Sequence, residues 1–352
     1  IKRFIQKGDE QLLARDYDKA IEAYEAVLKI QPNRAEAMEK LGDALIAAGR
    51  DDDAVKVYRQ ALNLDQSNVS LHYTLGILYE RKGLLDDAEA EYRHSLQHDS
   101  KNNDARRRLA DIYTLRGKFR QSIEEYSELI KLRANNPILH FKLARVYEKN
   151  KEFNKAIDEY LTAVRLSPDN LEVRKELAAL YGKKGMANEA EREYQEILQI
   201  DKNDFEIRNA LLTSYVKRKK YDALTALLKE AAELSPADAN AHYKLGIIYD
   251  FNKEYDSAVS EYQKAIDLND HHAKALNALG KLYMKTGDLE KAKSLLEAAR
   301  SADPKFTEPR ELLSNIREDL KPANYRKSSS KHGKMKKNSK AKKQVKQKKR
   351  KS

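Results

Sequence analysis

One repeat length runs through nearly the whole of this 352-residue sequence. The stretch HYTLGILYE at 72–80 returns as HYKLGIIYD at 242–250, and the 170 residues that separate the copies equal five periods of 34. Counted from Ile1, the period gives nine gapless repeats, 1-34, 35-68, 69-102, 103-136, 137-170, 171-204, 205-238, 239-272 and 273-306. A fixed period of this size is the signature of stacked repeat architectures, so it constrains the fold more than any local propensity does.

The same residue types recur at the same places of the repeat, which we number 1 to 34. Leu stands at place 7, Gly or Ala at place 8, Tyr at places 11 and 24, and Ala at place 20, as in Leu75, Gly76, Tyr79, Tyr92 and Ala88. Places 7, 8 and 11 share one stripe of a helix, and a Gly at place 15 ends that helix at low steric cost. Each repeat is therefore predicted to form two helices joined by a turn.

The pattern Leu-Gly-x-x-Tyr, then Ala-x-x-x-Tyr, then Pro resembles the tetratricopeptide repeat, a helix-turn-helix unit, over residues 1–306. The Trp usual at place 4 is replaced throughout by His, Arg, Met, Leu or Phe. One 34-residue hairpin cannot bury its apolar face alone, so neighbouring repeats must stack. The sequence thus predicts an all-α solenoid, and the resemblance implies a right-handed superhelix.

Residues after the ninth repeat divide into a cap and a tail. The start of 307–320 has an N-capping Thr307, an early Pro309 and an amphipathic pattern, which predict a C-terminal capping helix. Residues 321–352 contain 15 Lys and Arg, no Asp or Glu and almost no apolar residue, so we expect a disordered Lys-rich tail. The other 320 residues carry 53 basic and 56 acidic side chains, so the net charge of +12 comes from the tail.

Repeat seven departs from the pattern at three packing places. Leu212 replaces the small residue at place 8, Leu224 the Ala at place 20, and Leu228 the Tyr at place 24. We interpret these changes as compensated repacking. The alternative hypothesis is a local change of superhelical pitch.

No pattern in the sequence indicates catalysis. There is no Cys, and ten of the twelve Gly stand at places 8 and 15, which leaves no Gly-rich phosphate loop. His94 and His98 are four residues apart, but we interpret them as a solvated pair and not as a metal site. We predict a protein that is not an enzyme, with no metal and no cofactor. The alternative is a regulatory fragment of a larger enzyme whose catalytic domain precedes Ile1.

Binding residues are expected on the face of the first helix that lies opposite the place 7, 8 and 11 stripe. This groove face carries places 2, 5, 6, 9, 12 and 13, and the resemblance implies that it lines a concave groove holding a peptide or protein segment. An apolar cluster on this face comprises Val216, Tyr243, Ile247, Phe251 and Met284, with a smaller counterpart at Tyr73 and Ile77. A basic cluster comprises Arg107, Arg108, Lys142, Arg145, Lys149, Lys175 and Lys183.

Each cluster has an alternative interpretation. The apolar residues could serve packing against the neighbouring repeat, and five acidic residues on the basic face favour a mixed solvated surface over a site for acidic peptides. The resemblance also allows one family function to be tested. Place 9 is never Asn, so the carboxylate clamp with which related co-chaperones hold heat-shock chaperones is absent.

The tail and the absence of targeting patterns complete the functional prediction. The basic residues of the tail could bind nucleic acid, an anionic membrane or a nuclear import receptor, or they could only solubilise the chain. These residues are Lys336, Lys337, Lys342, Lys343, Lys348, Lys349, Arg350 and Lys351. No transmembrane segment or signal peptide is visible, so we expect a cytoplasmic protein, or a nuclear one if the source is eukaryotic. The predicted function is a non-enzymatic scaffold that binds a peptide or protein in its groove. The alternative is an adaptor localised by its tail on nucleic acid or an anionic membrane surface.

Overall fold

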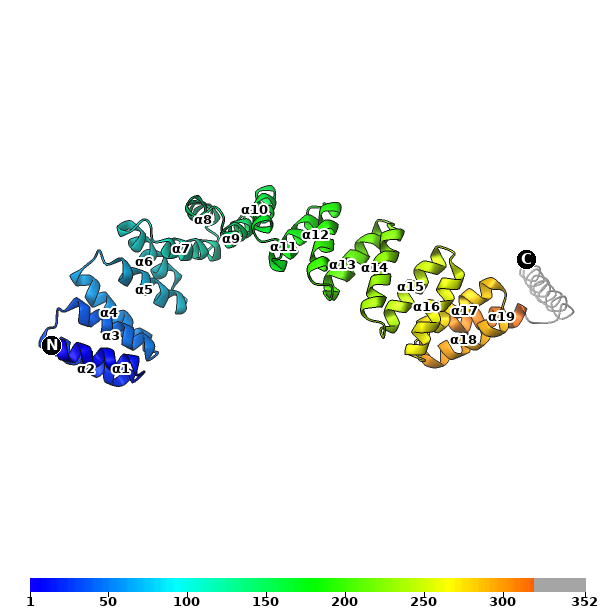
Figure 1. The fold of residues 1–352 in the computed structure, drawn as a ribbon, viewed down its shortest axis with the longest axis horizontal. Coiled ribbons are helices and arrows are strands. Elements are labelled where there is room, and N and C mark those ends of the chain that lie inside the picture. Colours follow the sequence, from blue (N-terminus) through cyan, green and yellow to red (C-terminus); the bar gives the residue numbers. More distant parts are fainter. Residues whose placement is uncertain (320–352) are drawn as a thin grey trace, which may run out of the picture. The chain divides into compact units, whose positions relative to one another are not determined.

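The computed structural model describes residues 1–319, which form nineteen α-helices joined by short turns (Figure 1). The first helices of the nine repeats are α1 (Lys2–Leu13), α3 (Ala35–Ala47), α5 (Val69–Arg81), α7 (Asn103–Leu115), α9 (Pro137–Lys149), α11 (Leu171–Lys183), α13 (Phe205–Lys217), α15 (Ala239–Phe251) and α17 (Ala273–Thr286). The second helices are α2 (Tyr17–Ile30), α4 (Asp51–Leu64), α6 (Leu85–His98), α8 (Phe119–Leu132), α10 (Phe153–Leu166), α12 (Ala187–Ile200), α14 (Tyr221–Leu234), α16 (Tyr255–Leu268) and α18 (Leu289–Ala302). The last helix is α19 (Glu308–Asp319).

The chain divides into two compact parts, an N-terminal part of Ile1–Glu193 and a C-terminal part that begins at Tyr194. Within each part a first helix packs on the second helix of its own repeat, and that second helix packs on the first helix of the next repeat (Figure 1). The predicted all-α solenoid of paired helices is confirmed. The tail predicted at 321–352 lies outside the described residues.

The turn after the first helix needs a residue in the left-handed backbone region. Gly49 and Gly83 supply it with φ values of +74° and +73°. Where Gly is missing at place 15, Arg15, Lys151 and Lys219 adopt φ values of 61°, 63° and 56°. Left-handed backbone costs a non-Gly residue roughly 1–2 kcal/mol, so the repeat geometry is imposed even where the local sequence opposes it.

The core of each regular repeat is built around the tyrosine at place 24. Its ring lies directly on the small residue at place 8 of the first helix, so that a Cβ atom added at Gly42 would come 2.2 Å from Cε1 of Tyr58. Tyr58 is 1% exposed, and its hydroxyl donates to the Asp43 carboxylate at 2.6 Å. The ring thus lies in the core, while the hydroxyl reaches a polar group on the groove face, as buried tyrosines generally require.

A basic residue, His or Arg, stands at place 4 instead of the expected Trp and connects three segments. The Nδ1 atom of His140 lies 2.6 Å from the Glu159 carboxylate, and its Nε2 atom lies 2.9 Å from the Ala134 carbonyl oxygen. Both neighbours only accept hydrogen bonds, so both interactions form when both ring nitrogens carry hydrogen. Arg174 donates to Glu193 and to the Pro168 carbonyl in the same way. We call this arrangement the place 4 clip, and it recurs at His72, Arg106 and His242.

Helix α19 packs on α17 and α18 as the first helix of a further repeat would. Leu313 and Ile316 are buried against α18. Arg310, which stands at place 4 in the continued numbering, donates to the Pro304 carbonyl at 2.8 Å. The Glu308 carboxylate accepts hydrogen bonds from Asn277 and Lys281 at 2.8 and 2.7 Å.

The contact between Gly42 and Tyr58 gives a first prediction. A Gly42→Ala variant should lose roughly 1–3 kcal/mol of unfolding free energy, because the added methyl group overlaps the tyrosine ring. Gly182→Ala is the matched control, since no atom lies within 4 Å of its added Cβ and helix propensity should slightly stabilise it. Urea unfolding followed by circular dichroism measures both. Equal shifts of the two midpoints would contradict this account of the core.

The place 4 clip gives a second prediction. His140→Arg should retain stability because Arg106 and Arg174 form the same two interactions in neighbouring repeats. His140→Leu should lose roughly 1–3 kcal/mol, because it leaves the Glu159 carboxylate and the Ala134 carbonyl without their donors. The same urea assay separates the variants. If Leu is tolerated as well as Arg, the clip does not stabilise the repeat.

Candidate functional site

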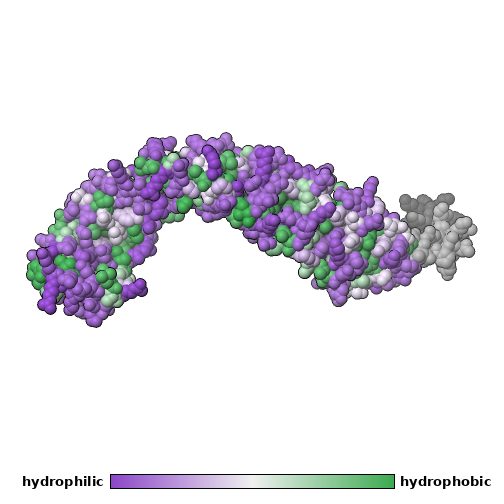
Figure 2. All heavy atoms as spheres, viewed as in Figure 1, coloured by the Kyte–Doolittle hydropathy of each residue, from purple (hydrophilic) through white to green (hydrophobic). Residues whose placement is uncertain are grey.

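The apolar cluster predicted on α13 and α15 includes three exposed side chains. Most of the surface visible in Figure 2 is hydrophilic, with hydrophobic residues in separate patches. Val216, Ile247 and Phe251 are 57%, 39% and 59% exposed. Val216 and Ile247 line one hollow, whereas Phe251 packs its ring against Tyr221 with centroids 4.6 Å apart.

The other predicted apolar residues are more engaged in packing. Tyr243 is half-buried, with its ring 5.0 Å from that of His272, and burial, helped by the Glu308 carboxylate, raises the pKa of its phenol. Met284 packs against the core that α19 completes. In the N-terminal part, Tyr73 and Ile77 pack against the hydrophobic core of the first repeats. The structure therefore brings together Val216 and Ile247, and leaves the remaining members separate from their hollow.

The hollow lies among α13, α14 and α15 and has a volume of about 610 Å³. We call it the apolar hollow; its lining residues are Asn209, Leu212, Thr213, Val216, Lys217, Leu224, Leu228, Lys244, Ile247 and Ile248. Sequence reasoning identified Val216 and Ile247 as site residues but not the leucines or Ile248. The signal was present in the departures of repeat seven, which were interpreted as repacking or as a change of superhelical pitch.

The hollow lies at the irregular core of repeat seven, where Leu212 and Leu228 replace the small residue and the tyrosine of the regular repeats. In repeat eight the Tyr262 ring lies on Gly246, where an added Cβ would come within 2.6 Å of the ring. In repeat seven Leu228 stands in place of that tyrosine and is buried at the base of the hollow, while Leu212 takes the place of the glycine. Two leucines thus fill the repeat incompletely, so the compensated repacking is only partial. A change of superhelical pitch stays a prediction.

The basic cluster in the N-terminal part is largely engaged with neighbouring groups. Lys142 donates to Asp111 at 2.7 Å, and Arg108 to Glu80 at 3.0 Å. The pairing of Lys142 with Asp111 has a counterpart outside this cluster, between Lys40 and Asp9. There burial alone would raise the pKa of Asp9, but hydrogen bonds from Lys40 and Tyr24 outweigh burial and lower that pKa. The other members lie as follows: Arg107 is 3.6 Å from Asp104, Lys183 is 3.3 Å from Glu148, Arg145 lies over the Phe141 ring, and Lys149 and Lys175 are exposed.

Comparison with known protein families assigns the sequence of this chain to one kind of repeat. Sequence profiles described as tetratricopeptide repeat match residues 2–34, 137–170, 209–273 and 252–316, and one described as TPR repeat matches 42–83 and 110–151. The chain is a tetratricopeptide-repeat (TPR) protein. Proteins built from TPR repeats are typically non-catalytic scaffolds for protein–protein interaction, and this is the general function that the family supports.

Solved TPR structures are similar to this TPR protein at low sequence identity. YrrB, "a TPR protein with an unusual peptide-binding site", is 21% identical over 53% of this chain and 96% of its own, with a TM-score of 0.40. A TPR protein from Parabacteroides merdae is 19% identical over 71% and 99%, with a TM-score of 0.41. The C-terminal part of one from Cytophaga hutchinsonii is 16% identical over 78% and 99%, with a TM-score of 0.49. No curated protein matches the chain.

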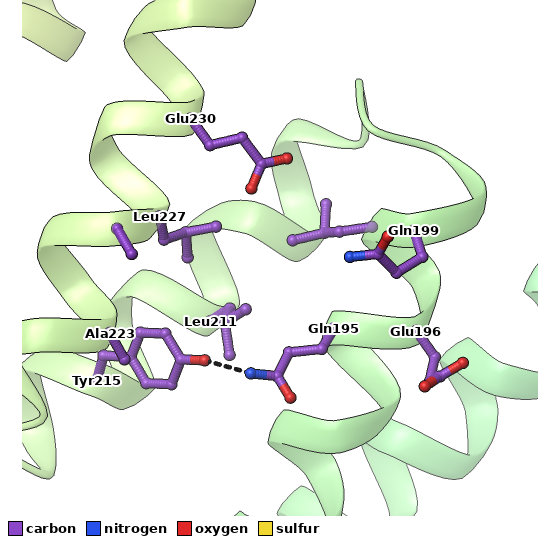
Figure 3. Close-up of a pocket in the computed structure, with 10 residues that line it drawn as sticks. Gln195, Glu196, Gln199, Leu211, Tyr215, Ala223, Leu227 and Glu230 are labelled. Atoms are coloured by element: carbon purple, nitrogen blue, oxygen red, sulfur yellow. Dashed lines mark hydrogen bonds between the residues drawn. The ribbon is translucent and has the colours of Figure 1, made fainter.

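A second hollow of the TPR protein, about 460 Å³, lies between α12 and α14 (Figure 3). In it Gln195 donates a hydrogen bond to the Tyr215 hydroxyl at 2.8 Å. A hollow of about 360 Å³ recurs 102 residues earlier, with Arg93 and Tyr113 at the matching positions. Because it recurs three repeats apart, this hollow is a product of repeat geometry, unlike the apolar hollow, which depends on the irregular repeat.

Two further predictions concern features outside the groove. His94 and His98 stack their rings on His72 with centroids 5.2 and 6.1 Å away, and across residues 1–316 no group of three or more His, Asp or Glu side chains could hold a metal ion. Within the described helices, none is long and apolar enough to cross a membrane. The predicted polyanion-binding residues, Lys336 to Lys351, lie outside the described residues.

Proposed function

We propose that this TPR protein is a non-enzymatic scaffold that holds a segment of a partner protein against the groove face of α13 and α15. An apolar side chain of that segment is anchored in the apolar hollow. The observation that carries the proposal is the hollow itself, which opens beside the exposed side chains of Val216 and Ile247.

The size and lining of the apolar hollow fit such an anchor. Ligand pockets commonly measure about 300–1,000 Å³, and a volume of about 610 Å³ falls within that range. Six of the ten lining residues are Leu, Ile or Val, and burying one large apolar side chain among them contributes about 1.5–3 kcal/mol. Interfaces usually depend on a few such buried anchors, so one hollow is enough to define a binding site.

The packing interpretation of the apolar cluster accounts less well for these residues. Side chains that serve the core are covered, as Leu224 and Leu228 are at 2% and 4% exposure. Val216 is more than half exposed although it lies beside them. An apolar side chain that borders a hollow and faces solvent supports an interaction surface.

Filling the hollow should abolish binding without unfolding the protein. The Leu212→Gly/Leu228→Tyr variant restores the residues of repeat eight, where the Tyr262 ring packs on Gly246. A library of displayed random 15-residue peptides is selected on the full chain and counter-selected on this variant. The counter-selection removes peptides that bind elsewhere, because both proteins keep the same tail.

The selected peptides should bind the unaltered chain and lose about tenfold or more in affinity for Ile247→Glu, which places a charge at an apolar contact. Phe205→Glu is the matched control, because Phe205 is an exposed apolar residue of α13 that does not line the hollow. Fluorescence anisotropy measures the dissociation constants. If no peptide distinguishes the chain from the filled variant, the apolar hollow is not a binding site.

The basic tail supports a second and compatible proposal, that residues 321–352 attach the scaffold to nucleic acid or an anionic membrane surface. It rests on the 15 Lys and Arg residues of the tail and the absence of Asp and Glu there. Deleting 321–352 should remove binding to duplex DNA and leave peptide binding intact. Binding by the full chain should weaken with salt at a log–log slope of about −0.9 per phosphate neutralised. DNA affinity that is indifferent to salt or to the deletion would refute this proposal.

A further inference from the structure

Two lysines border the apolar hollow, Lys217 on α13 and Lys244 on α15. Neither forms an ion pair with any side chain of residues 1–316. No acidic residue lines the hollow, and the nearby Asp250 on α15 is already engaged by Lys285 at 3.3 Å. The rim of the hollow therefore carries two positive charges that residues 1–316 leave without a counter-charge.

The repeat register shows why Lys244 lacks a partner. At the same place 6, Lys40 and Lys142 each reach an Asp at place 9 of the preceding repeat at 2.7 Å. The residue at place 9 before Lys244 is Thr213, which carries no charge. Repeat seven thus lacks both the tyrosine at place 24 and an acid at place 9.

The sequence also offers Lys217 no acid at the corresponding place of the preceding repeat. It stands at place 13, from which Lys183 reaches Glu148 and Lys285 reaches Asp250, both at place 12 of the preceding repeat. In the sequence, place 12 of repeat six, which precedes the repeat of Lys217, is Gly182. Both ammonium groups beside the hollow thus occupy places that elsewhere in the chain are neutralised.

We infer that the segment held at the apolar hollow is acidic, with Asp or Glu residues flanking its apolar anchor so that they pair with Lys217 and Lys244. This inference rests on the proposed function and names the chemistry of its partner. Charge complementarity also excludes the chain's own tail as the occupant, because residues 321–352 contain only basic charges and would be repelled. Charges at the rim of an interface act mainly by accelerating association, whereas the buried anchor controls dissociation.

The peptides selected above on the full chain provide the test. We expect them to contain Asp or Glu within a few residues of an apolar residue. For such a peptide, Lys217→Glu/Lys244→Glu should slow association about five- to tenfold at 50 mM salt and change dissociation little. The difference should shrink at 500 mM salt, where charges are screened within a few ångströms. Replacing the acidic residues of the peptide by Lys should restore fast association with the charge-reversed variant, Lys217→Glu/Lys244→Glu.

Lys274→Glu is the matched control, because it reverses one exposed charge on α17, away from the hollow, and should leave the association rate unchanged. Peptides that need the hollow but show no acidic preference, and that associate equally fast with the reversed variant, would overturn the inference while the proposed function stands. A second copy of the chain as the occupant would appear as concentration-dependent dimers, seen by sedimentation, that Ile247→Glu disperses. That outcome would overturn the acidic-segment inference too.

Discussion

The packing of a tyrosine ring on a glycine or alanine connects the core of each regular repeat to its groove face. The small residue at place 8 lets the ring of Tyr24 or Tyr58 lie against the backbone of the first helix, which sets how closely the two helices approach. In repeats one, two and four the hydroxyl emerges on the groove face and donates to an Asp, and in repeat one that Asp also accepts from Lys40 of the next repeat. One core contact therefore helps to determine the charge pattern of the groove.

Repeat seven shows what happens when that contact is removed. In repeat seven the volume of the tyrosine ring is missing. Place 9 of the same repeat is Thr213, so Lys244 of the next repeat has no acid to pair with at that place. The apolar hollow and the unpaired positive charge of Lys244 therefore occur together at one irregular repeat. The irregular core of repeat seven thus coincides, on the groove face, with an open apolar hollow that two lysines border.

Features of the fold that depend on residues close together in the sequence could be predicted, whereas contacts between residues far apart in the sequence could not. The period and the helix stripes are local patterns, so the helix pairs followed from them directly. The hollow did not follow from a local pattern. Two leucines appear large enough to replace a glycine and a tyrosine, and only the packing of Leu212 and Leu228 in three dimensions shows that space remains. The place 4 clips were also missed, since His140 meets a carboxylate 19 residues later and a carbonyl six residues earlier. Lys142 and Asp111 were assigned to one face, but their pairing across repeats required coordinates.

Helix α19 has a consequence for how such an array changes length. It is held by the interactions that any first helix makes, namely buried Leu313, the Arg310 contact to the Pro304 carbonyl, and side chains reaching across from α17. A whole repeat inserted between α18 and α19 would present the same contacts to α19 that repeat nine presents now. Duplication or loss of repeats can therefore lengthen or shorten the groove face without a new terminal structure having to arise each time.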